Sequence, residues 1–273
     1  MKERFAVVGG DARQLRLGKA LEQDGATVFY HGFSRRGEEE PDVEESSLEQ
    51  CAACDVVILP LPASMDGEHI HMPLGEGQIP LRQVVELARP GTLVVGGKLP
   101  PLLWEAAAHR EVAVEDYFAR EELQVLNAIP TAEGAVQIAM EELGVTLHGT
   151  PVLILGYGRI GKLLAHRLQG LGCRVTVAAR KCSDRAWIGA FGLQPVDFSQ
   201  LEKHLSSQLL VCNTVPQQVL GEREISAIPK DGLILDLASK PGGEEEGRRQ
   251  KFQVDRHGEA GRCHMHRAGG DAT

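Results

Sequence analysis

The sequence predicts an α/β protein with two Rossmann-like parallel-sheet lobes and a cleft between them. The first observation is that short apolar runs, typical of buried strands, alternate with amphipathic runs that are typical of helices. The second is a glycine motif at 156–161, which follows an apolar run and precedes a helical pattern. The third is size, because 273 residues with 42% apolar content suffice for two ordinary cores.

Four strands and two helices are predicted in the first half of the chain. The strands lie at residues 5–8, 27–30, 56–59 and 92–95. One helix runs through Leu15 to Gly25, where glycine would end it, and another covers 81–89. The acidic stretch 38–49 is expected to be an exposed loop that enters a helix. Ligands of parallel sheets bind beyond the carboxyl ends of strands, so the candidate binding loops are 9–13, 60–66 and 96–98.

A linking helix is predicted between the two halves. Thr131 is a candidate N-cap for a helix from about Ala132 to Leu143. Residues 127–133 would then lie at the mouth of the cleft, although a plain connector explains them equally well. The predicted domains are a substrate or partner lobe at 1–130, the linking helix at 131–148, a cofactor lobe at 149–243 and an atypical tail at 244–273.

The glycine motif predicts a dinucleotide site in the second half. Gly156 permits a tight turn, Gly158 lets the backbone approach a pyrophosphate, and Gly161 lets helix and strand pack closely. The N-terminus of the following helix faces the phosphate charge. The candidate cofactor contacts here are Gly156, Tyr157, Gly158, Arg159, Ile160 and Gly161.

The end of the next strand indicates which dinucleotide binds. An NAD enzyme usually has an acidic residue about 20 residues after the glycines, where it holds the ribose 2′-hydroxyl. After the strand at 174–178 this chain has Ala179, Arg180 and Lys181, with no acid before Asp184. Paired cations suit a 2′-phosphate. NADP is therefore predicted, with NAD and a merely solvated loop as the alternatives.

Two later strand ends complete the predicted cofactor site. A strand at 209–212 is followed by a segment expected to run under the nicotinamide ribose, made of Asn213, Thr214, Val215 and Pro216. Another strand begins at Leu233 and leads to Ser239, which is expected near the nicotinamide ring.

Composition excludes several classes of protein. A net charge of -9 and 4% aromatic residues argue against nucleic-acid binding. No run approaches the ~20 apolar residues of a membrane span, and the N-terminus enters a strand directly, so a cytoplasmic protein is expected. Cys51 and Cys54 form an isolated CxxC and are expected to pack as small hydrophobes. No metal site is predicted, and one C-terminal group is interpreted as accidental: His257, Cys263, His264 and His266.

Several long stretches resemble the A-subunit family of dipicolinate synthase, the sporulation enzyme that makes pyridine-2,6-dicarboxylate. They lie between residues 6 and 243 and read VVGGDARQ, LPLPASMDG, DYFAREELQVLNAIPTAEGAVQIAMEE, LHGTPVLILGYGRIGKLLAHRLQGLGCRVTVAARK, NTVP and LDLASKPGG. The resemblance implies two Rossmann-like lobes, a nicotinamide cofactor and oxidation of a dihydrodipicolinate-type intermediate from the lysine pathway. It also implies a partner, a flavoprotein-like B subunit, and a setting, the mother-cell cytoplasm during sporulation.

The chemistry implied by the resemblance needs cations for two carboxylates and one proton acceptor. The candidate acceptors are Lys98 and Glu133, although Glu133 is equally plausible as a first-turn acid that complements a helix dipole. The residues predicted to bind the dicarboxylate substrate are Arg13, Ser64, Arg120, Asn127 and Thr131, with Lys98 as a further cation.

Two rival functions stay open. One is another NAD(P)-dependent dehydrogenase of the hydroxy-acid or amino-acid type, which would pair a His or Lys with an acid; no such pair is evident. The other is a chain that binds cofactor or partner without turnover. The tail supports this second rival, because the resemblance stops at Gly243 and neither helical nor strand period follows. The tail is expected to lie outside the working fold and to leave a sheet edge uncovered, as after a frameshift or a premature end. Neither the oligomeric state nor any dependence on a B subunit is predicted.

Overall fold

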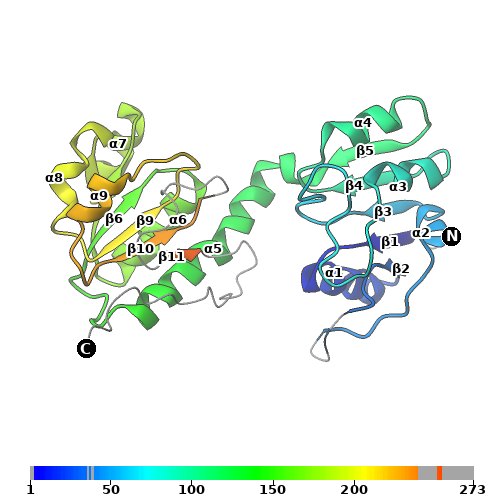
Figure 1. Ribbon diagram of the computed structural model, residues 1–273, viewed down its shortest axis with the longest axis horizontal. Helices are drawn as coiled ribbons and strands as arrows, with labels where there is room; N and C mark the ends of the chain where they lie inside the picture. The colour runs from blue at the N-terminus through cyan, green and yellow to red at the C-terminus, as the bar shows by residue number, and fades with distance from the viewer. Residues whose placement is uncertain (1–2, 36, 38–39, 239–250, 254–273) are drawn as a thin grey trace, which may run out of the picture. The chain divides into compact units, whose positions relative to one another are not determined.

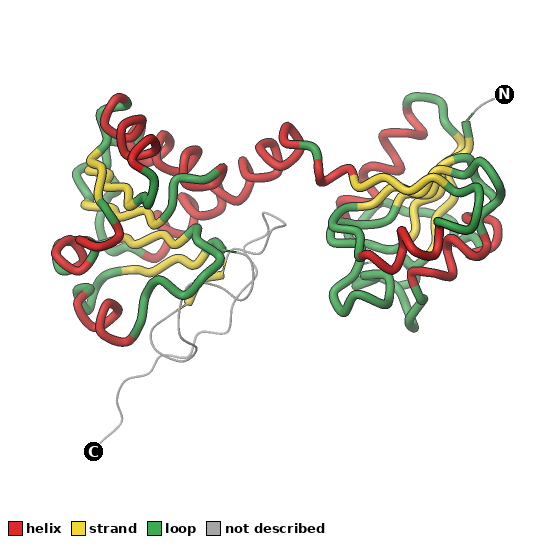
Figure 2. The backbone as a smooth tube through the Cα atoms, turned by 90° about the horizontal axis from the view of Figure 1, so that it is seen from above, coloured by secondary structure: helices red, strands yellow, loops and turns green. Residues whose placement is uncertain are grey.

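The computed structural model describes residues 3–35, 37, 40–238 and 251–253, and it divides into two compact units. Unit 1 extends to Leu123 and unit 2 begins at Gln124. Each unit contains a parallel sheet with helices on its two faces (Figures 1 and 2). The predicted α/β class with two Rossmann-like lobes is therefore confirmed. The predicted cleft and the predicted domain boundaries stay predictions.

Unit 1 is a five-stranded sheet in the order β2-β1-β3-β4-β5. Its strands are β1 Arg4–Val8, β2 Thr27–His31, β3 Val56–Ile58, β4 Leu93–Gly96 and β5 Ala113–Asp116. Its helices are α1 Ala12–Gln23, α2 Leu48–Ala52, α3 Leu81–Leu87, α4 Pro101–Ala107 and the short 3₁₀ helix η1 Tyr117–Ala119. As predicted, Gly25 follows α1 in a left-handed conformation, with φ of 91°.

Alternation along β1 explains why both faces of this sheet are covered. Ala6 and Val8 pack with the buried side chains of α2, α3 and α4 on one face. Val7 points to the opposite face, where it packs with Leu15 of α1 and with Phe33. Because successive strand residues point to opposite faces, an unbroken apolar run is what a sheet buried on both sides requires.

Unit 2 is a six-stranded sheet in the order β11-β10-β9-β6-β7-β8. Its strands are β6 Pro151–Leu155, β7 Arg174–Ala178, β8 Gln194–Val196, β9 Leu210–Asn213, β10 Leu233–Asp236 and β11 Lys251–Gln253. Its helices after the link are α6 Arg159–Gly170, α7 Cys182–Ala190, η2 Phe198–Gln200, α8 Glu202–Leu205 and α9 Glu222–Ala227. Renumbered from β6, this is the 3-2-1-4-5-6 order of the dinucleotide-binding fold, whose strand order reverses between β6 and β9.

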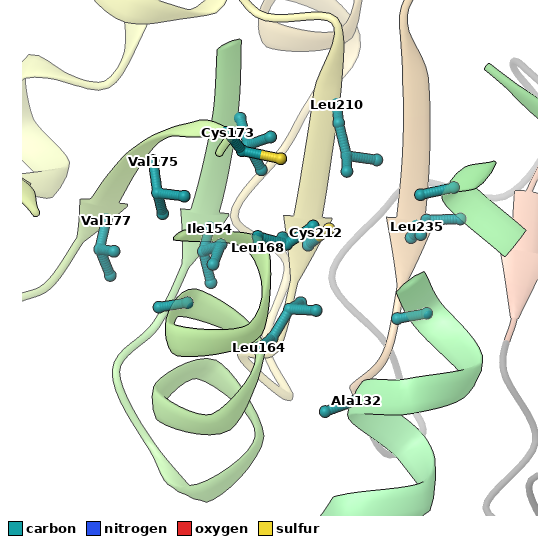
Figure 3. Close-up of a cluster of buried hydrophobic side chains, with 14 of the residues drawn as sticks. Ala132, Ile154, Leu164, Leu168, Cys173, Val175, Val177, Leu210, Cys212 and Leu235 are labelled. Atoms are coloured by element: carbon teal, nitrogen blue, oxygen red, sulfur yellow. The ribbon is translucent and has the colours of Figure 1, made fainter. Parts of the chain in front are cut away.

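The core of unit 2 lies on both faces of its sheet. Figure 3 shows one face, where Leu164 and Leu168 of α6 lie beside Ile154 of β6 and Cys212 of β9, and Leu235 of β10 belongs to the same buried cluster. Leu153 and Leu155 face the other side, toward α8 and α9. Cys51 and Cys54 belong to the core of unit 1, as predicted, and the buried Cys173 and Cys212 belong to the core of unit 2. Burial raises the pKa of the Cys51 thiol to about 12.

The linking helix begins earlier than predicted. Helix α5 covers Glu121–Glu142, and Pro130 lies inside it. Thr131 is therefore an interior residue, 3% exposed, and its assignment as N-cap is wrong. Glu133 likewise is not a first-turn acid, because Glu121 and Glu122 hold that place. Strong helix formers before Pro130, together with these acids at the positive helix end, favour the earlier start.

Three residues of the predicted tail form a strand. β11 pairs in parallel with β10, with Leu235 opposite Phe252, so the expectation of an uncovered sheet edge is wrong at these positions. Backbone hydrogen bonds make this pairing, which explains why the pattern of apolar residues in the sequence did not predict the strand. Ser239, His257, Cys263, His264 and His266 lie outside the described residues. Among the described residues, no helix combines the length and the apolar character that crossing a bilayer requires.

Candidate functional site

The turn after β6 has the geometry that the glycine motif predicts. Gly156 adopts a φ of 99°, and a Cβ placed on it would lie 2.6 Å from Thr214 Oγ1. A Cβ on Gly161 would collide with the Gly156 carbonyl oxygen, so α6 packs against the turn through bare backbone. Residue 156 therefore makes the turn, and residue 161 permits the close approach of helix and strand.

The N-terminus of α6 is left open. Gly158 is the N-cap residue, it provides no side-chain cap, and the position of its missing Cβ has no atom within 4 Å. The Cβ direction of the N-cap residue is thus open at the positive end of the helix, as a pyrophosphate site requires. Tyr157 turns its ring into the core, beneath the Lys162 ammonium at 5.4 Å, and Ile160 packs against that core.

The loop after β9 forms the floor beneath this turn. Thr214 Oγ1 donates to the Leu155 carbonyl at 2.8 Å, which fixes the hydroxyl below Gly156. Asn213 is fully buried, and its amide donates to Asp236 Oδ1 and to the Val215 carbonyl, both at 3.0 Å. Asn213 therefore ties together the carboxyl ends of β9 and β10, while Val215 and Pro216 continue the loop.

The cations predicted after β7 lie at the surface of the same unit. Arg180 is exposed, donates to Gln217 Oε1 at 3.1 Å and lies 5.7 Å above the Phe198 ring. Lys181 is exposed and precedes the first residue of α7. Gln217, which was not predicted as a site residue, links this strand end to the loop after β9. The ends of β6, β7 and β9 thus surround one side of the open helix terminus.

In unit 1, Arg13 is held at the carboxyl edge of the sheet. Its guanidinium binds the Asp11 carboxylate through Nε at 3.0 Å and Nη2 at 2.9 Å, and Nη2 also donates to the Leu61 carbonyl at 2.8 Å. Asp11 was not among the predicted residues. Any substrate carboxylate that binds Arg13 must share it with this neighbour.

Lys98 lies on the same edge, after β4. Its backbone N–H donates to Asp116 Oδ1 at 3.2 Å, and its ammonium lies 5.9 Å from the Phe118 ring centroid. Asp116 also accepts from Phe118 N at 2.8 Å, so this carboxylate shapes the loop. Tyr117 donates its hydroxyl to the Leu59 carbonyl at 3.1 Å, and burial raises the pKa of that phenol. Asp116 and Tyr117 were both missed as site residues.

Ser64 begins a tight turn that contains a histidine–acid pair. Its hydroxyl donates to Asp66 Oδ1 at 2.9 Å, and Asp66 Oδ2 lies 2.8 Å from His69 Nδ1. Backbone N–H groups of His69 and Glu68 also donate to Asp66 and hold the pKa of its carboxyl well below its usual range. No such pair was evident in the sequence, because the pairing of Asp66 with His69 depends on how this turn folds.

The glycine turn of unit 1 is filled by its own chain. Gly10 N donates to the His71 carbonyl at 2.8 Å, and a Cβ on Gly9 would meet Ile70 and Met72 side chains at 2.7 and 2.8 Å. At the start of α1, Asp11 caps the helix and accepts from Arg13 N at 2.9 Å. In this turn, residues 70–72 and the Asp11 carboxylate therefore fill the space in which a phosphate would bind in a dinucleotide turn.

The remaining predicted residues lie along α5 or just before it. Arg120 is exposed and binds Glu122 Oε1 through Nε at 2.7 Å. Asn127 is half-buried, Thr131 is buried inside the helix, and exposed Glu133 pairs with Arg167 Nη2 at 3.1 Å. Lys98 belongs to unit 1 and Glu133 to unit 2, so neither unit alone brings the two candidate bases together.

Known proteins resemble the chain over both units. Residues 4–118 match the family described as the N-terminal domain of the dipicolinate synthase A subunit, and residues 122–239 match the NAD binding domain of D-isomer specific 2-hydroxyacid dehydrogenases. The A subunit of Bacillus subtilis dipicolinate synthase is 31% identical over 246 residues, which cover 88% of this chain and 82% of that protein.

Two crystal structures are similar to the whole fold. The A chain of dipicolinate synthase from Bacillus subtilis has a TM-score of 0.76 at 28% identity, over 90% of this chain and 83% of that one. The A subunit of dipicolinate synthase from Bacillus halodurans has a TM-score of 0.75 at 26% identity, over 90% and 85% of the two chains. The similarity thus spans both the open turn of unit 2 and the filled turn of unit 1.

Proposed function

Because the chain belongs to the family of the dipicolinate synthase A subunit, we propose that it oxidises a dihydrodipicolinate-type dicarboxylate to pyridine-2,6-dicarboxylate with NADP. Its second unit matches an NAD-binding domain of dehydrogenase type, so the chain is an NAD(P)-dependent oxidoreductase. The observation that carries the proposal is the match of one relative across both units rather than across the cofactor domain alone.

The residues of unit 2 fit a dinucleotide. The bare α6 terminus at Gly158 offers N–H groups to a pyrophosphate, and Thr214 and Asn213 hold the neighbouring loops in place. When bound, the nicotinamide supplies the hydride acceptor for the oxidation. Arg180 and Lys181 supply positive charge at the end of β7, which supports NADP over NAD.

We assign substrate contacts to the carboxyl edge of unit 1. Arg13 and Lys98 are the cations proposed to hold the two carboxylates, with Ser64 and Arg120 as further contacts. Formation of an aromatic product makes the oxidation downhill, so the task of the protein is chiefly orientation. With Lys98 charged, Glu133 is the proposed proton acceptor; in the alternative, a neutral Lys98 accepts the proton and Arg120 holds the second carboxylate. Asn127 stays a candidate contact. The position of Thr131 inside α5 removes the argument for its role.

The proposal includes a cellular setting and a second polypeptide. The Bacillus subtilis relative is called the A subunit of its enzyme, which implies that it has a partner. We propose that the partner of this chain is a flavoprotein-like B subunit, with the mother-cell cytoplasm during sporulation as the location of both.

A turnover assay tests the proposed reaction. The purified chain, with and without the B subunit, is supplied with the lysine-pathway precursor and either NADP or NAD. About one equivalent of pyridine-2,6-dicarboxylate should form for each reduced cofactor, because one hydride leaves the substrate for each product. Cofactor binding without product in the presence of the partner would contradict the proposed activity.

One observation favours a second candidate, a 2-hydroxyacid dehydrogenase. The His69–Asp66 pair has the arrangement of an imidazole oriented by a carboxylate, which suits a general base for a hydroxyl group. The same assay with a panel of small 2-hydroxy acids separates the two. Hydroxy-acid oxidation that is lost in His69→Asn would favour this candidate over the first.

A further inference from the structure

The loop that follows β7 is held by an arginine from the helix after it. Arg185 of α7 reaches back, and its Nη1 donates to the Ala179 carbonyl at 2.8 Å and to the Arg180 carbonyl at 2.7 Å. The same nitrogen lies 2.7 Å from Asp197 Oδ2. One side chain therefore binds both carbonyls of the loop and an acid from the neighbouring strand.

Asp197 lies where an acid can influence cofactor choice. It follows β8, which pairs with β7, and Ala179 N donates to the Val196 carbonyl at 3.0 Å. Its Oδ1 accepts from Ser199 N at 2.9 Å and from Ser199 Oγ at 2.8 Å, so the carboxylate is fixed in place. In dinucleotide-binding folds, an acid near the end of the second strand, here β7, holds the ribose hydroxyls of NAD, and Asp197 lies at the end of the adjacent strand β8.

We propose that Arg185 is a positioning residue that sets the preference for a 2′-phosphorylated dinucleotide by engaging Asp197 and the two loop carbonyls. This inference rests on the proposed use of NADP. Without Arg185, the Asp197 carboxylate and two carbonyl dipoles would present negative charge beside Arg180. A 2′-phosphate would be repelled, whereas ribose hydroxyls would gain acceptors.

Arg185 and Asp197 are expected to have opposite effects on the preference for NADP over NAD. Arg185 is 23% exposed at its side chain and Asp197 is 38% exposed, so the pair is partly shielded from water rather than free on the surface. Charge neutralisation in such a place acts over a short distance and is only partly screened by salt. Removal of the arginine alone should therefore change the cofactor ratio, and removal of both partners should partly restore it.

The test measures dissociation constants of NADP and NAD for the full chain and for Arg185→Met, Asp197→Asn and the double variant, by calorimetry, with thermal midpoints recorded alongside. In Arg185→Met the ratio of NADP to NAD affinity should fall about tenfold or more, the scale of one charge-assisted hydrogen bond. The double variant should regain part of that loss. Arg174→Met is the matched control, because Arg174 also donates to a backbone carbonyl, that of Gly149 at 3.0 Å, but at the amino end of β7.

The outcomes separate the inference from the function on which it rests. If the parent chain binds NAD at least as tightly as NADP, the proposed cofactor is wrong and the inference fails with it. If the parent prefers NADP and Arg185→Met keeps the same ratio, only the inference is overturned. Equal weakening of both cofactors without recovery in the double variant also overturns it, because that is a structural role alone. Should Arg185→Met not fold, Arg185→Gln decides, because its amide keeps polar contacts but carries no charge to neutralise Asp197: a lowered ratio supports the inference and an unchanged ratio overturns it.

Discussion

The glycine turns of the two units have the same topology, but the helix after the turn begins differently in each: with a side-chain cap in unit 1 and without one in unit 2. Each turn follows the first strand of its sheet and leads into a helix, α1 in unit 1 and α6 in unit 2. In unit 1 the segment 70–75 lies over the turn, and the Asp11 carboxylate caps the helix. In unit 2 the helix begins at Gly158 with no side-chain cap and with open space beside it. A strand–turn–helix alone is therefore not an anion site; the helix terminus must also be left without a partner from the chain.

The largest loss of stability and of cofactor affinity is expected for a substitution at Gly161, which lets α6 pack against the turn of unit 2. In Gly161→Ala the new methyl group meets the Gly156 carbonyl, which cannot turn aside. Overpacking of this kind costs about 1–3 kcal/mol of unfolding free energy, and cofactor affinity should fall with it because α6 is displaced. Urea unfolding and cofactor titration measure the two effects.

Gly158→Ala and Gly170→Ala are matched variants on the same helix. Neither glycine has an atom within 4 Å of its missing Cβ. Gly158→Ala should keep the fold but weaken cofactor binding, because its methyl group enters the space proposed for phosphate. Gly170→Ala should change neither appreciably. Normal cofactor affinity in both Gly161→Ala and Gly158→Ala would contradict the placement of the dinucleotide at this turn.

The next effect concerns the cations beside the open turn. Arg180→Ala should weaken NADP binding by about 1.5–3 kcal/mol, the range for a hydrogen bond to a charged group, and should leave NAD binding nearly unchanged. Calorimetric titration with both cofactors checks this. Arg223→Ala serves as control, since Arg223 is an exposed arginine of the same unit that pairs with Glu202. A parent chain that binds NAD at least as tightly would refute the NADP assignment.

A smaller effect is expected when the filled turn of unit 1 loses its cap. Asp11→Ala removes the N-cap of α1 and the carboxylate partner of Arg13, and should lower the unfolding free energy by about 1 kcal/mol. Cofactor affinity should stay unchanged, because the dinucleotide is assigned to unit 2. Asp11→Asn, which keeps a capping oxygen, should recover most of the stability. A loss of cofactor affinity in Asp11→Ala would show that the two turns do not differ as described.

The smallest effect is the pH dependence of the stability that Asp66 contributes, in the turn that leads into segment 70–75. Backbone N–H groups lower the pKa of Asp66 in the folded protein, so its contribution to stability is present above the unfolded pKa of about 3.9. That contribution is lost as pH falls through the lower folded pKa. The thermal midpoints of the parent and of Asp66→Asn should therefore differ at pH 6 and converge below about pH 4. A difference that grows in acid would reverse the assigned sign.

The sequence predicts the parts of the molecule that are governed by local pattern. Continuous apolar runs mark the strands buried on both faces, and the glycine motif marks the open turn because its residues are neighbours in the chain. The edge strands β5 and β8 were missed, since they are short and partly exposed and carry no clear period. The helix start was predicted at Thr131, although the favourable residues before Pro130 outweigh the one hydrogen bond that this proline loses.

Site features that depend on tertiary contacts could not be predicted. Asn213 and Asp236 meet only because β9 and β10 are neighbours, and Arg185 meets Asp197 only because α7 folds back beside β8. Asn213 was predicted only as part of a loop beside the cofactor, and the other three residues look ordinary in the sequence. The sequence therefore located the loops of the candidate site but not the side chains that hold those loops in shape.

Strand β11 shows how little a sheet edge depends on the sequence of the strand that completes it. The sixth strand position is filled by a segment that joins β10 through backbone pairing. Every residue except proline carries the same N–H and C=O groups, so backbone pairing at this position is compatible with almost any sequence. An evolving gene could therefore exchange the segment after β10 for an unrelated one and still close the edge, provided that the new segment reaches β10 and leaves its N–H groups available.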